Sequence, residues 1–230
     1  MSGAAWGIII FIIIMVIIVI VFLIWRFSTG KTGKTTNTNT PTPTPVIPTN
    51  AIKYGDTINF FNTDSSFGGF MATCGAPPAE STSTCSSNVS VLPESSTSNR
   101  WKILSTSGIA TGTAIKYGEK VFIQSTSNNN NLGYCGSTVC SSDTGKFNVG
   151  TFNSANSNHT SSNWLFSNKG TSTSIYVVPN NNIYVQNTSG DLLWVCGQAP
   201  ADGTSSCGIN VTNVSNKATF PSLSTWQIRT

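Results

Sequence analysis

The sequence predicts an all-β domain of three similar repeats, preceded by one membrane-spanning α-helix. An uncharged apolar run near the N-terminus predicts the helix. Three landmarks that recur about every 62 residues predict the repeats, whose apolar residues alternate instead of following helical spacing. We expect a transmembrane anchor over residues 1–27, a linker over residues 28–50 and the repeat domain over residues 51–230.

The anchor is predicted by residues 4–25, which carry no charged side chain and include an unbroken apolar run over residues 8–24. A helix of this length measures about 33 Å, close to the ~30 Å hydrocarbon core of a bilayer. Trp6 and Trp25 mark its two ends, as expected for interfacial aromatic residues. A cleaved signal peptide is the alternative, but the apolar run is too long and lacks a small-residue cleavage site.

Residues 28–50 form a linker rich in threonine and proline. Proline alternates with threonine at Pro41, Pro43 and Pro45, a pattern that favours extended polyproline II structure and a semi-rigid spacer. An unstructured tether without a defined length is equally compatible with this composition.

Basic residues follow the anchor directly, at Arg26, Lys31 and Lys34. The two Gly-Lys-Thr triplets resemble the end of a phosphate-binding loop. However, the first glycine of that motif is replaced by Ser28, and an anchor instead of a strand precedes it. We therefore expect no nucleotide cofactor, and we expect the three basic side chains to contact lipid headgroups.

Three landmarks repeat along the rest of the chain with one common period. The motif Ile-Lys-Tyr-Gly-Asp at residues 52–56 recurs with glutamate at residues 115–119 and is degenerate in the third copy. A Cys-Gly pair begins at Cys74, Cys135 and Cys196, and a Trp-x-apolar motif begins at Trp101, Trp164 and Trp226. The repeats therefore span about residues 51–109, 110–172 and 173–230.

Each repeat is expected to hold about four short strands separated by Gly, Asn, Ser and Pro turns. The first strand alternates, with Ile58 and Phe60 on one face, and the second precedes the Cys-Gly pair. Residues 88–92 and 209–214 suggest a third strand. The fourth carries the recurring tryptophan, which we expect in the core.

Three copies of four strands resemble a β-trefoil, in which six strands close a barrel and three hairpins cap one end. The Tyr-Gly-acidic opening is similar to that of MIR-type and agglutinin-type trefoils. Carbohydrate-binding ricin-B-type trefoils carry glutamine two residues before the tryptophan, where this chain has Asn99, Ser162 and Ser224. The resemblance therefore implies the fold and only weakly implies a lectin.

Six cysteines lie in the repeat domain, two in each repeat: Cys74, Cys85, Cys135, Cys140, Cys196 and Cys207. Pairing within each repeat is the simplest of the 15 connectivities, because residues 74–85 and 196–207 are near copies. Each bridge would stabilise the fold by about 2–3 kcal/mol. No Cys-x-x-Cys spacing or nearby histidine indicates a metal, so none is expected.

The signals for membrane sidedness conflict. Arg26, Lys31 and Lys34 place the domain on the cytosolic side, whereas disulfides and five Asn-x-Ser/Thr sequons favour the opposite side. In a chain this rich in Asn, Ser and Thr, sequons also arise by chance. Large DNA viruses with an internal membrane accommodate both signals, and the composition resembles that of their virion proteins. We therefore expect the bilayer and capsid shell proteins as partners.

The charge pattern excludes several function classes. Only 9% of residues are charged, and the net charge of +4 lies mostly beside the anchor, so the repeat domain is nearly neutral. This is too little positive charge for nucleic-acid binding. The single histidine, His159, lies in a polar loop, and no pair of carboxylates suggests catalysis. We expect neither an enzyme nor a cofactor.

Trp194 is the first candidate binding residue. It precedes the third Cys-Gly pair by two residues, where the other repeats have Ala72 and Gly133. Small residues in two copies suggest that the core does not need this position, which makes Trp194 a candidate for an exposed indole. Exposed aromatic rings stack on sugars or anchor protein contacts. Local packing of the ring beneath a loop is the favoured interpretation.

Phe122 and Tyr184 are further candidates, since they occupy the outward position of the first strand, where the first repeat has Asn59. With these residues, the sequence predicts a non-enzymatic, membrane-anchored recognition or scaffolding module. The favoured setting is the internal membrane of a virion, with the domain facing the capsid. A membrane-anchored lectin or adhesin that binds glycans is the alternative function.

Overall fold

The computed structural model describes residues 15–20, 22, 45–74, 87–137, 145–152, 162–170, 172–195, 209–214 and 222–230. For residues 135–137, 145–148 and 209–214 the description covers the backbone. The chain divides into two compact units, Met1–Pro45 and Val46–Thr230.

In the N-terminal unit, residues 15–20 and 22 are helical and exposed. Within the described residues, no helix combines the length and the apolar character needed to span a bilayer. Most of the expected anchor over residues 4–25 lies outside those residues. So do most of the linker and the basic side chains Arg26, Lys31 and Lys34, so these expectations stay predictions.

The second unit is an antiparallel β domain, as the alternating apolar pattern predicts. A short 3-10 helix, Thr97–Asn99, precedes the fourth strand. The strands of the described part are β1 (Thr57–Asn62), β2 (Gly69–Cys74), β3 (Ser87–Leu92), β4 (Trp101–Ser105), β5 (Lys120–Ser125), β6 (Asn131–Ser137), β7 (Gly145–Phe152), β8 (Trp164–Asn168), β9 (Asn182–Asn187), β10 (Leu192–Val195), β11 (Ile209–Val214) and β12 (Trp226–Arg229).

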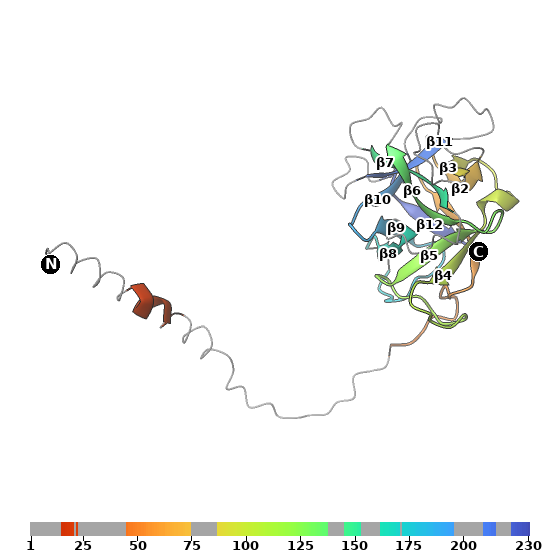
Figure 1. Cartoon of the computed structure of the whole chain (residues 1–230). Helices are drawn as coiled ribbons and strands as arrows, with labels where there is room; N and C mark the ends of the chain where they lie inside the picture. The colour runs from red at the N-terminus through yellow and green to blue at the C-terminus, as the bar shows by residue number, and fades with distance from the viewer. Residues whose placement is uncertain are drawn as a thin grey trace, which may run out of the picture. The chain divides into compact units, whose positions relative to one another are not determined.

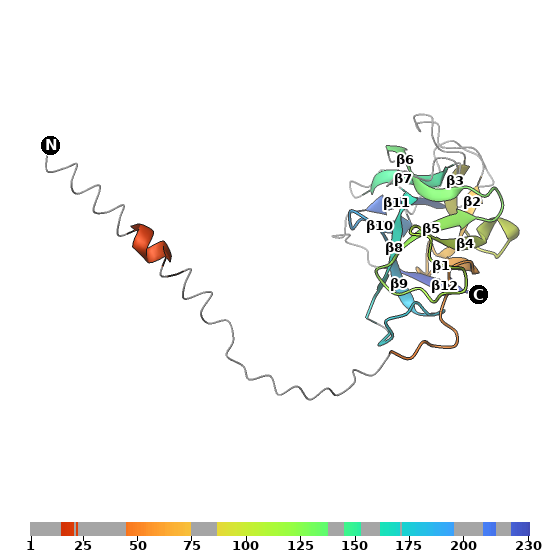
Figure 2. The same ribbon diagram turned by 60° about the horizontal axis from the view of Figure 1, so that its bottom comes forward.

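Six of these strands close a barrel. β1 pairs with β4, β4 with β5, β5 with β8, β8 with β9, β9 with β12, and β12 with β1. The pairs β2–β3, β6–β7 and β10–β11 are hairpins, and their second strands β3, β7 and β11 also pair with one another. These hairpins gather at one end of the barrel, so the chain has the expected β-trefoil-like fold (Figure 1 and Figure 2).

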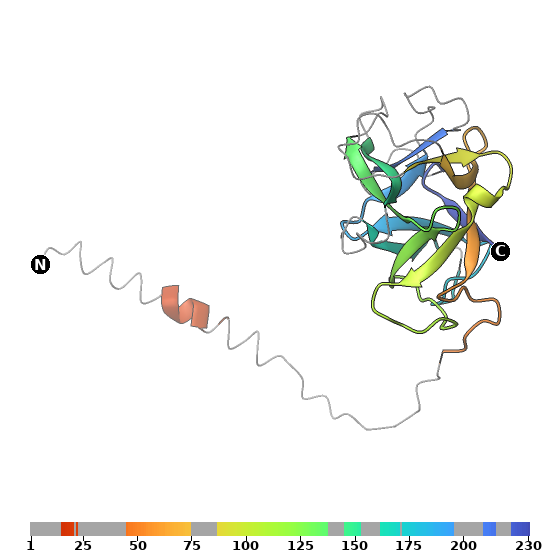
Figure 3. The ribbon, with the colours of Figure 1, turned by 45° about the vertical axis from the view of Figure 1, so that its right-hand side comes forward.

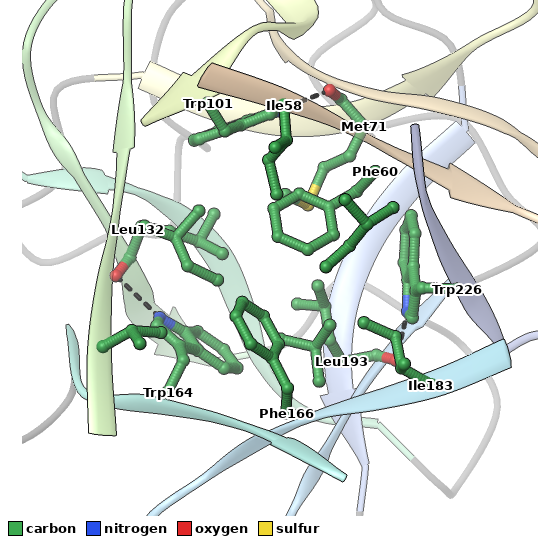
Figure 4. Close-up of a cluster of buried hydrophobic side chains, with 14 of the residues drawn as sticks. Ile58, Phe60, Met71, Trp101, Leu132, Trp164, Phe166, Ile183, Leu193 and Trp226 are labelled. Carbon is green, nitrogen blue, oxygen red and sulfur yellow. Dashed lines mark hydrogen bonds between the residues drawn. The ribbon is translucent and has the colours of Figure 1, made fainter. Parts of the chain in front are cut away.

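The core is organised by the recurring tryptophans, each fully buried as the sequence predicts. The indole Nε1 of each of these tryptophans donates to a backbone carbonyl on the first strand of its own repeat's hairpin, so each fourth strand is tied to the hairpin of its repeat (Figure 4). The bonds are Trp101 to Met71 (2.7 Å), Trp164 to Leu132 (2.9 Å) and Trp226 to Leu193 (3.0 Å).

A second set of bonds joins the repeats to one another at the opposite end of the barrel, where the segments around residues 50 and 110 lie (Figure 3). The amide of Ile52 donates to the carbonyl of Val177 (2.8 Å), that of Ile115 to Ile52 (2.8 Å), and that of Val177 to Ile115 (2.9 Å). These three bonds form a closed backbone ring, so each repeat contacts both others.

The degenerate third copy of the Tyr-Gly-acidic motif keeps its backbone shape. Gly55 and Gly118 adopt φ values of +93° and +83°, and Asn180 takes the equivalent position with φ +62°. Asparagine tolerates this left-handed conformation better than other non-glycine residues. The amides of all three donate to carbonyls of the fourth strands, at Ile103, Phe166 and Ile228 (2.7–2.9 Å).

Replacing each glycine by alanine separates backbone strain from steric contact. An added Cβ at Gly55 would lie 2.4 Å from Thr111 Cγ2, whereas no atom lies within 4 Å of one at Gly118. We expect Gly118→Ala to lower the free energy of unfolding by about 1–2 kcal/mol through strain alone. Gly55→Ala should cost more than Gly118→Ala, because the exposed side chain of Thr111 has to move away from the added Cβ. Urea denaturation measures both, and equal losses would contradict the predicted contact.

Tyr54, buried in the first repeat, donates its hydroxyl to Glu119 Oε2 of the second repeat (3.1 Å). Burial, followed by the charge and hydrogen bond of Glu119, raises the pKa of Tyr54 from 10.0 to about 12. Because the pKa of Tyr54 is higher in the folded state than in the unfolded state, protonated Tyr54 stabilises the fold. This stabilisation is fully present below pH 10 and is lost as pH rises through about 12.

This coupling predicts the alkaline titration of the domain. The tyrosinate absorbance near pH 12 should lose the step contributed by one tyrosine in Tyr54→Phe, while Tyr117 and Tyr134, whose pKa values burial also raises, keep titrating above pH 10. Glu119→Gln removes the negative charge but not the burial, so the step should move to lower pH while staying above 10. An unchanged step in Glu119→Gln would show that the carboxylate does not act on Tyr54.

The structure tests part of the cysteine and sequon expectations. Cys74 is disulfide-bonded, and it is the one cysteine whose side chain lies in the described part. The expected partner Cys85 lies outside that part, so the pairing stays a prediction.

Two sequon asparagines, Asn88 and Asn187, are buried, and Asn187 Nδ2 donates to Asp191 (2.9 Å). Neither has room for a glycan in this fold, so neither argues for an extracytosolic domain.

Candidate binding surface

Trp194 lies inside the domain, so it is not the exposed indole that would make it a binding residue. Its side chain is 2% exposed and belongs to the main hydrophobic core, because every residue of β10 is buried. The equivalent Ala72 is 0% exposed. The small residues Ala72 and Gly133 therefore reflect crowding where the three hairpins meet and not a position at the surface. The Nε1 of Trp194 is shielded and has no hydrogen-bond partner.

Phe122 and Tyr184 do occupy outward positions of the barrel wall and are half-buried. The ammonium of Lys169 lies 5.4 Å from the centre of the Tyr184 ring. However, β5 and β9 are separated by β8, and Trp194 is in the core. The structure therefore does not bring the three expected aromatic residues together into one site.

A different set of side chains does come together on the outside of the barrel. Because β1 alternates, Ile58 and Phe60 point inward and Phe61 points outward. Phe61 pairs directly with Phe70 of β2. On β12, which also pairs with β1, Arg229 lies opposite Asn59 of β1. We call Phe61, Phe70 and Arg229 the Arg229 patch.

The patch is built around a cation held on an aromatic ring. The guanidinium carbon of Arg229 lies 3.5 Å from the centre of the Phe61 ring and 5.7 Å from that of Phe70. The two rings meet edge to face, 5.1 Å apart at 66°. The guanidinium thus covers one face of Phe61, while Phe70 supports that ring from the side.

Polar side chains continue the patch along the barrel wall. Arg229 Nη2 donates to Gln227 Oε1 (3.4 Å), and Gln227 Nε2 donates to Asn182 Oδ1 (3.1 Å). The side-chain oxygen of Asn59, the register partner of Arg229, is shielded from solvent without a hydrogen-bond partner. A shielded, unpaired acceptor leaves the surface incomplete in hydrogen bonds without an added group.

The carboxylates nearest in sequence to β1 are engaged elsewhere. Asp56 accepts the amide of Lys53 (2.8 Å), and Asp64 accepts the amides of Ser66 and Phe67 (2.9 Å each). Burial alone would raise the pKa of Asp64, but these amides and a hydroxyl hydrogen bond lower it, which keeps the group ionised and bound in its own turn. Within the described residues, Arg229 has no ion pair.

The patch breaks the threefold pattern of the domain. The positions equivalent to Phe61 are Gln124 and Gln186, and those equivalent to Arg229 are Leu104 and Ser167. The difference between the repeats at these positions is the sequence signal for the patch. It is hard to recognise because Phe61 directly follows the core residue Phe60, so the two residues look like part of one apolar run.

The described residues hold no group of three or more His, Cys, Asp or Glu side chains placed to bind a metal ion. His159 lies outside those residues. The arrangement on the barrel wall is therefore best suited to non-covalent contacts: one cation, two aromatic rings and neighbouring amides.

No family model matches the chain, and no curated protein matches it. Among solved structures, it is similar to a Caenorhabditis elegans protein of unknown function (TM-score 0.66, 15% identity), which covers 80% of this chain and 98% of its own. An SDF2-like protein from Arabidopsis thaliana is also similar (TM-score 0.63, 15% identity), with coverage of 77% and 94%.

A third similar structure is the S. cerevisiae protein O-mannosyltransferase Pmt1–Pmt2 complex bound to the sugar donor (TM-score 0.64, 16% identity). The match covers 82% of this chain but 27% of the yeast chain, so this chain spans about a quarter of that protein. At these identities the likeness shows a shared fold and nothing about ligands.

A double-mutant cycle measures whether the cation and the ring interact. Combining Arg229→Gln with Phe61→Leu should give a coupling energy of about 0.5–1 kcal/mol in urea denaturation, as for an exposed cation–π pair. Combining Arg229→Gln with Phe122→Leu, on a separate part of the wall, should give none. Equal couplings in the two cycles would contradict a specific contact.

Proposed function

We propose that the chain is a non-enzymatic, membrane-anchored recognition module whose β-trefoil holds a protein partner near a membrane. The Arg229 patch carries this proposal. Arginine and aromatic residues are the side chains most enriched among binding hot spots. Here one arginine and two aromatic rings stand together on the outer wall, at positions where the other repeats have different side chains.

A protein partner is favoured because the outward ring is already covered. Sugar-binding aromatic residues offer a free ring face on which a sugar stacks. The guanidinium of Arg229 lies 3.5 Å from the centre of the Phe61 ring and occupies that face. The groups left for a partner are the planar guanidinium of Arg229 and the phenylalanine rings beside it, which can contact polar and apolar side chains of a protein surface.

The membrane part of the proposal is supported by the sequence. The uncharged run over residues 4–25 is the proposed anchor, and Arg26, Lys31 and Lys34 are the proposed headgroup contacts. The Thr/Pro linker gives the domain reach. We propose the internal membrane of a virion as the location of the chain, with the domain facing the capsid shell and a disulfide within each repeat. This setting accommodates both the basic residues after the anchor and the disulfides.

Glycan binding is the second candidate function. One observation favours it: the half-buried aromatic ring of Tyr184 lies on the outer wall of the barrel. This mode would use Tyr184 and Phe122 and would not need Arg229.

Three measurements on one preparation separate these functions. The full chain should resist alkaline carbonate extraction from membranes, because a transmembrane helix anchors it. Chemical cross-linking there should join the domain to a shell protein, and a glycan array probed with residues 46–230 should stay blank. Glycan binding that Tyr184→Ala abolishes, without any protein cross-link, would instead establish the lectin function.

A further inference from the structure

We infer that the Arg229 patch recognises a carboxylate: an Asp or Glu side chain of the protein partner, paired with the Arg229 guanidinium while an adjoining apolar side chain covers Phe70. This rests on the proposed recognition function and adds the chemistry of the ligand. Carboxylate recognition by arginine is strong when two N–H groups bind the two oxygens together.

The stacked position of Arg229 leaves its donors available. A guanidinium has five N–H donors in its plane, and stacking on a ring uses the face of the group and not its edge. One donor is directed to Gln227 at 3.4 Å, a long hydrogen bond. The other donors have no acceptor among the described residues, so an edge of the guanidinium is free for a bidentate pair.

Stacking also fixes the arginine before a ligand arrives. A long surface side chain normally loses rotamer freedom on binding, which lowers affinity. Contact with Phe61, support of Phe61 by Phe70, and the bond to Gln227 hold Arg229 in one place. The wall therefore presents a preorganised cation.

The charge of Arg229 needs an anion from outside the described domain. Asp56 and Asp64 are bound within their own turns, and Arg229 makes no ion pair with any residue that the structure describes. The exposed Lys102, on β4 beside β1, adds a second positive charge near this wall and would steer an acidic partner toward it.

The single guanidinium selects among anions. One planar monocation matches one carboxylate in charge and geometry, whereas phosphate-tracking surfaces use many basic side chains. The domain as a whole is nearly neutral, which disfavours a polyanion. An acidic sugar would also present a carboxylate, but its ring would compete with Arg229 for the face of Phe61.

The first test uses small probes and the domain spanning residues 46–230, which forms its own compact unit and holds the hydrophobic core. In NMR titrations, N-acetyl-Phe-Glu-amide should shift the Arg229 Nε–H signal and the amides of Phe61 and Gln227. N-acetyl-Phe-Gln-amide should bind at least about tenfold more weakly, since it lacks the charged pair. Equal binding of the two peptides would overturn the inference.

Variants identify the residue. Arg229→Gln should abolish the preference for the Glu peptide, and Arg229→Lys, which keeps the charge but not the fork, should lose about tenfold. Lys116→Gln is the matched control, because it removes one exposed positive charge in the second repeat; it should leave binding within about twofold. An equal loss in Lys116→Gln would mean unspecific charge attraction. Glucuronate binding tighter than the Glu peptide would assign the site to a sugar.

A capture experiment with the full chain separates this inference from the proposed function. If wild-type chain cross-links to a shell protein and Arg229→Gln does not, both stand. If both chains cross-link equally, the recognition function stands and the carboxylate inference fails. If neither the wild-type chain nor the variant captures a protein, the proposed function itself fails.

Discussion

The fold depends on one small set of backbone hydrogen bonds, the ring that joins Ile52, Ile115 and Val177. Each residue of this ring gives its amide to one neighbour and its carbonyl to the other, so no repeat completes its hydrogen bonding alone. At the opposite end, β3, β7 and β11 pair with one another in the same cyclic manner. The barrel is closed because both of its ends are tied by all three repeats, and the core tryptophans connect those ends.

This constraint explains what the sequence predicts well. The tryptophan bonds need the same residue type once in every repeat, and the ring and the left-handed turns need similar residues at the same positions, so all three recur periodically in the sequence. Trp101, Trp164 and Trp226 were recognisable as core residues for that reason. Even the degenerate third turn is explained by Asn180, which replaces glycine without changing the backbone shape.

A binding surface on a domain of similar repeats shows the opposite pattern in the sequence, because its residues differ between the repeats whereas core residues recur. Trp194 is such a residue, yet its side chain lies in the core. The Arg229 patch could not be predicted because Phe61 and Arg229 come from the first and last strands, and only the pairing of β1 with β12 brings them together. A repeat period shows which positions are unusual, whereas burial decides which of them face solvent.

The pairing of β1 with β12 also has a consequence for the order of events during synthesis. These strands lie at opposite ends of the domain's sequence and have to meet before the barrel closes. Contacts this distant along the chain make folding slow, and they cannot form until the ribosome has released the last strand. Since Arg229 reaches Phe61 only through this pairing, a nascent or truncated chain has no Arg229 patch. A domain that lacks β12 therefore also lacks the surface that we propose binds a partner.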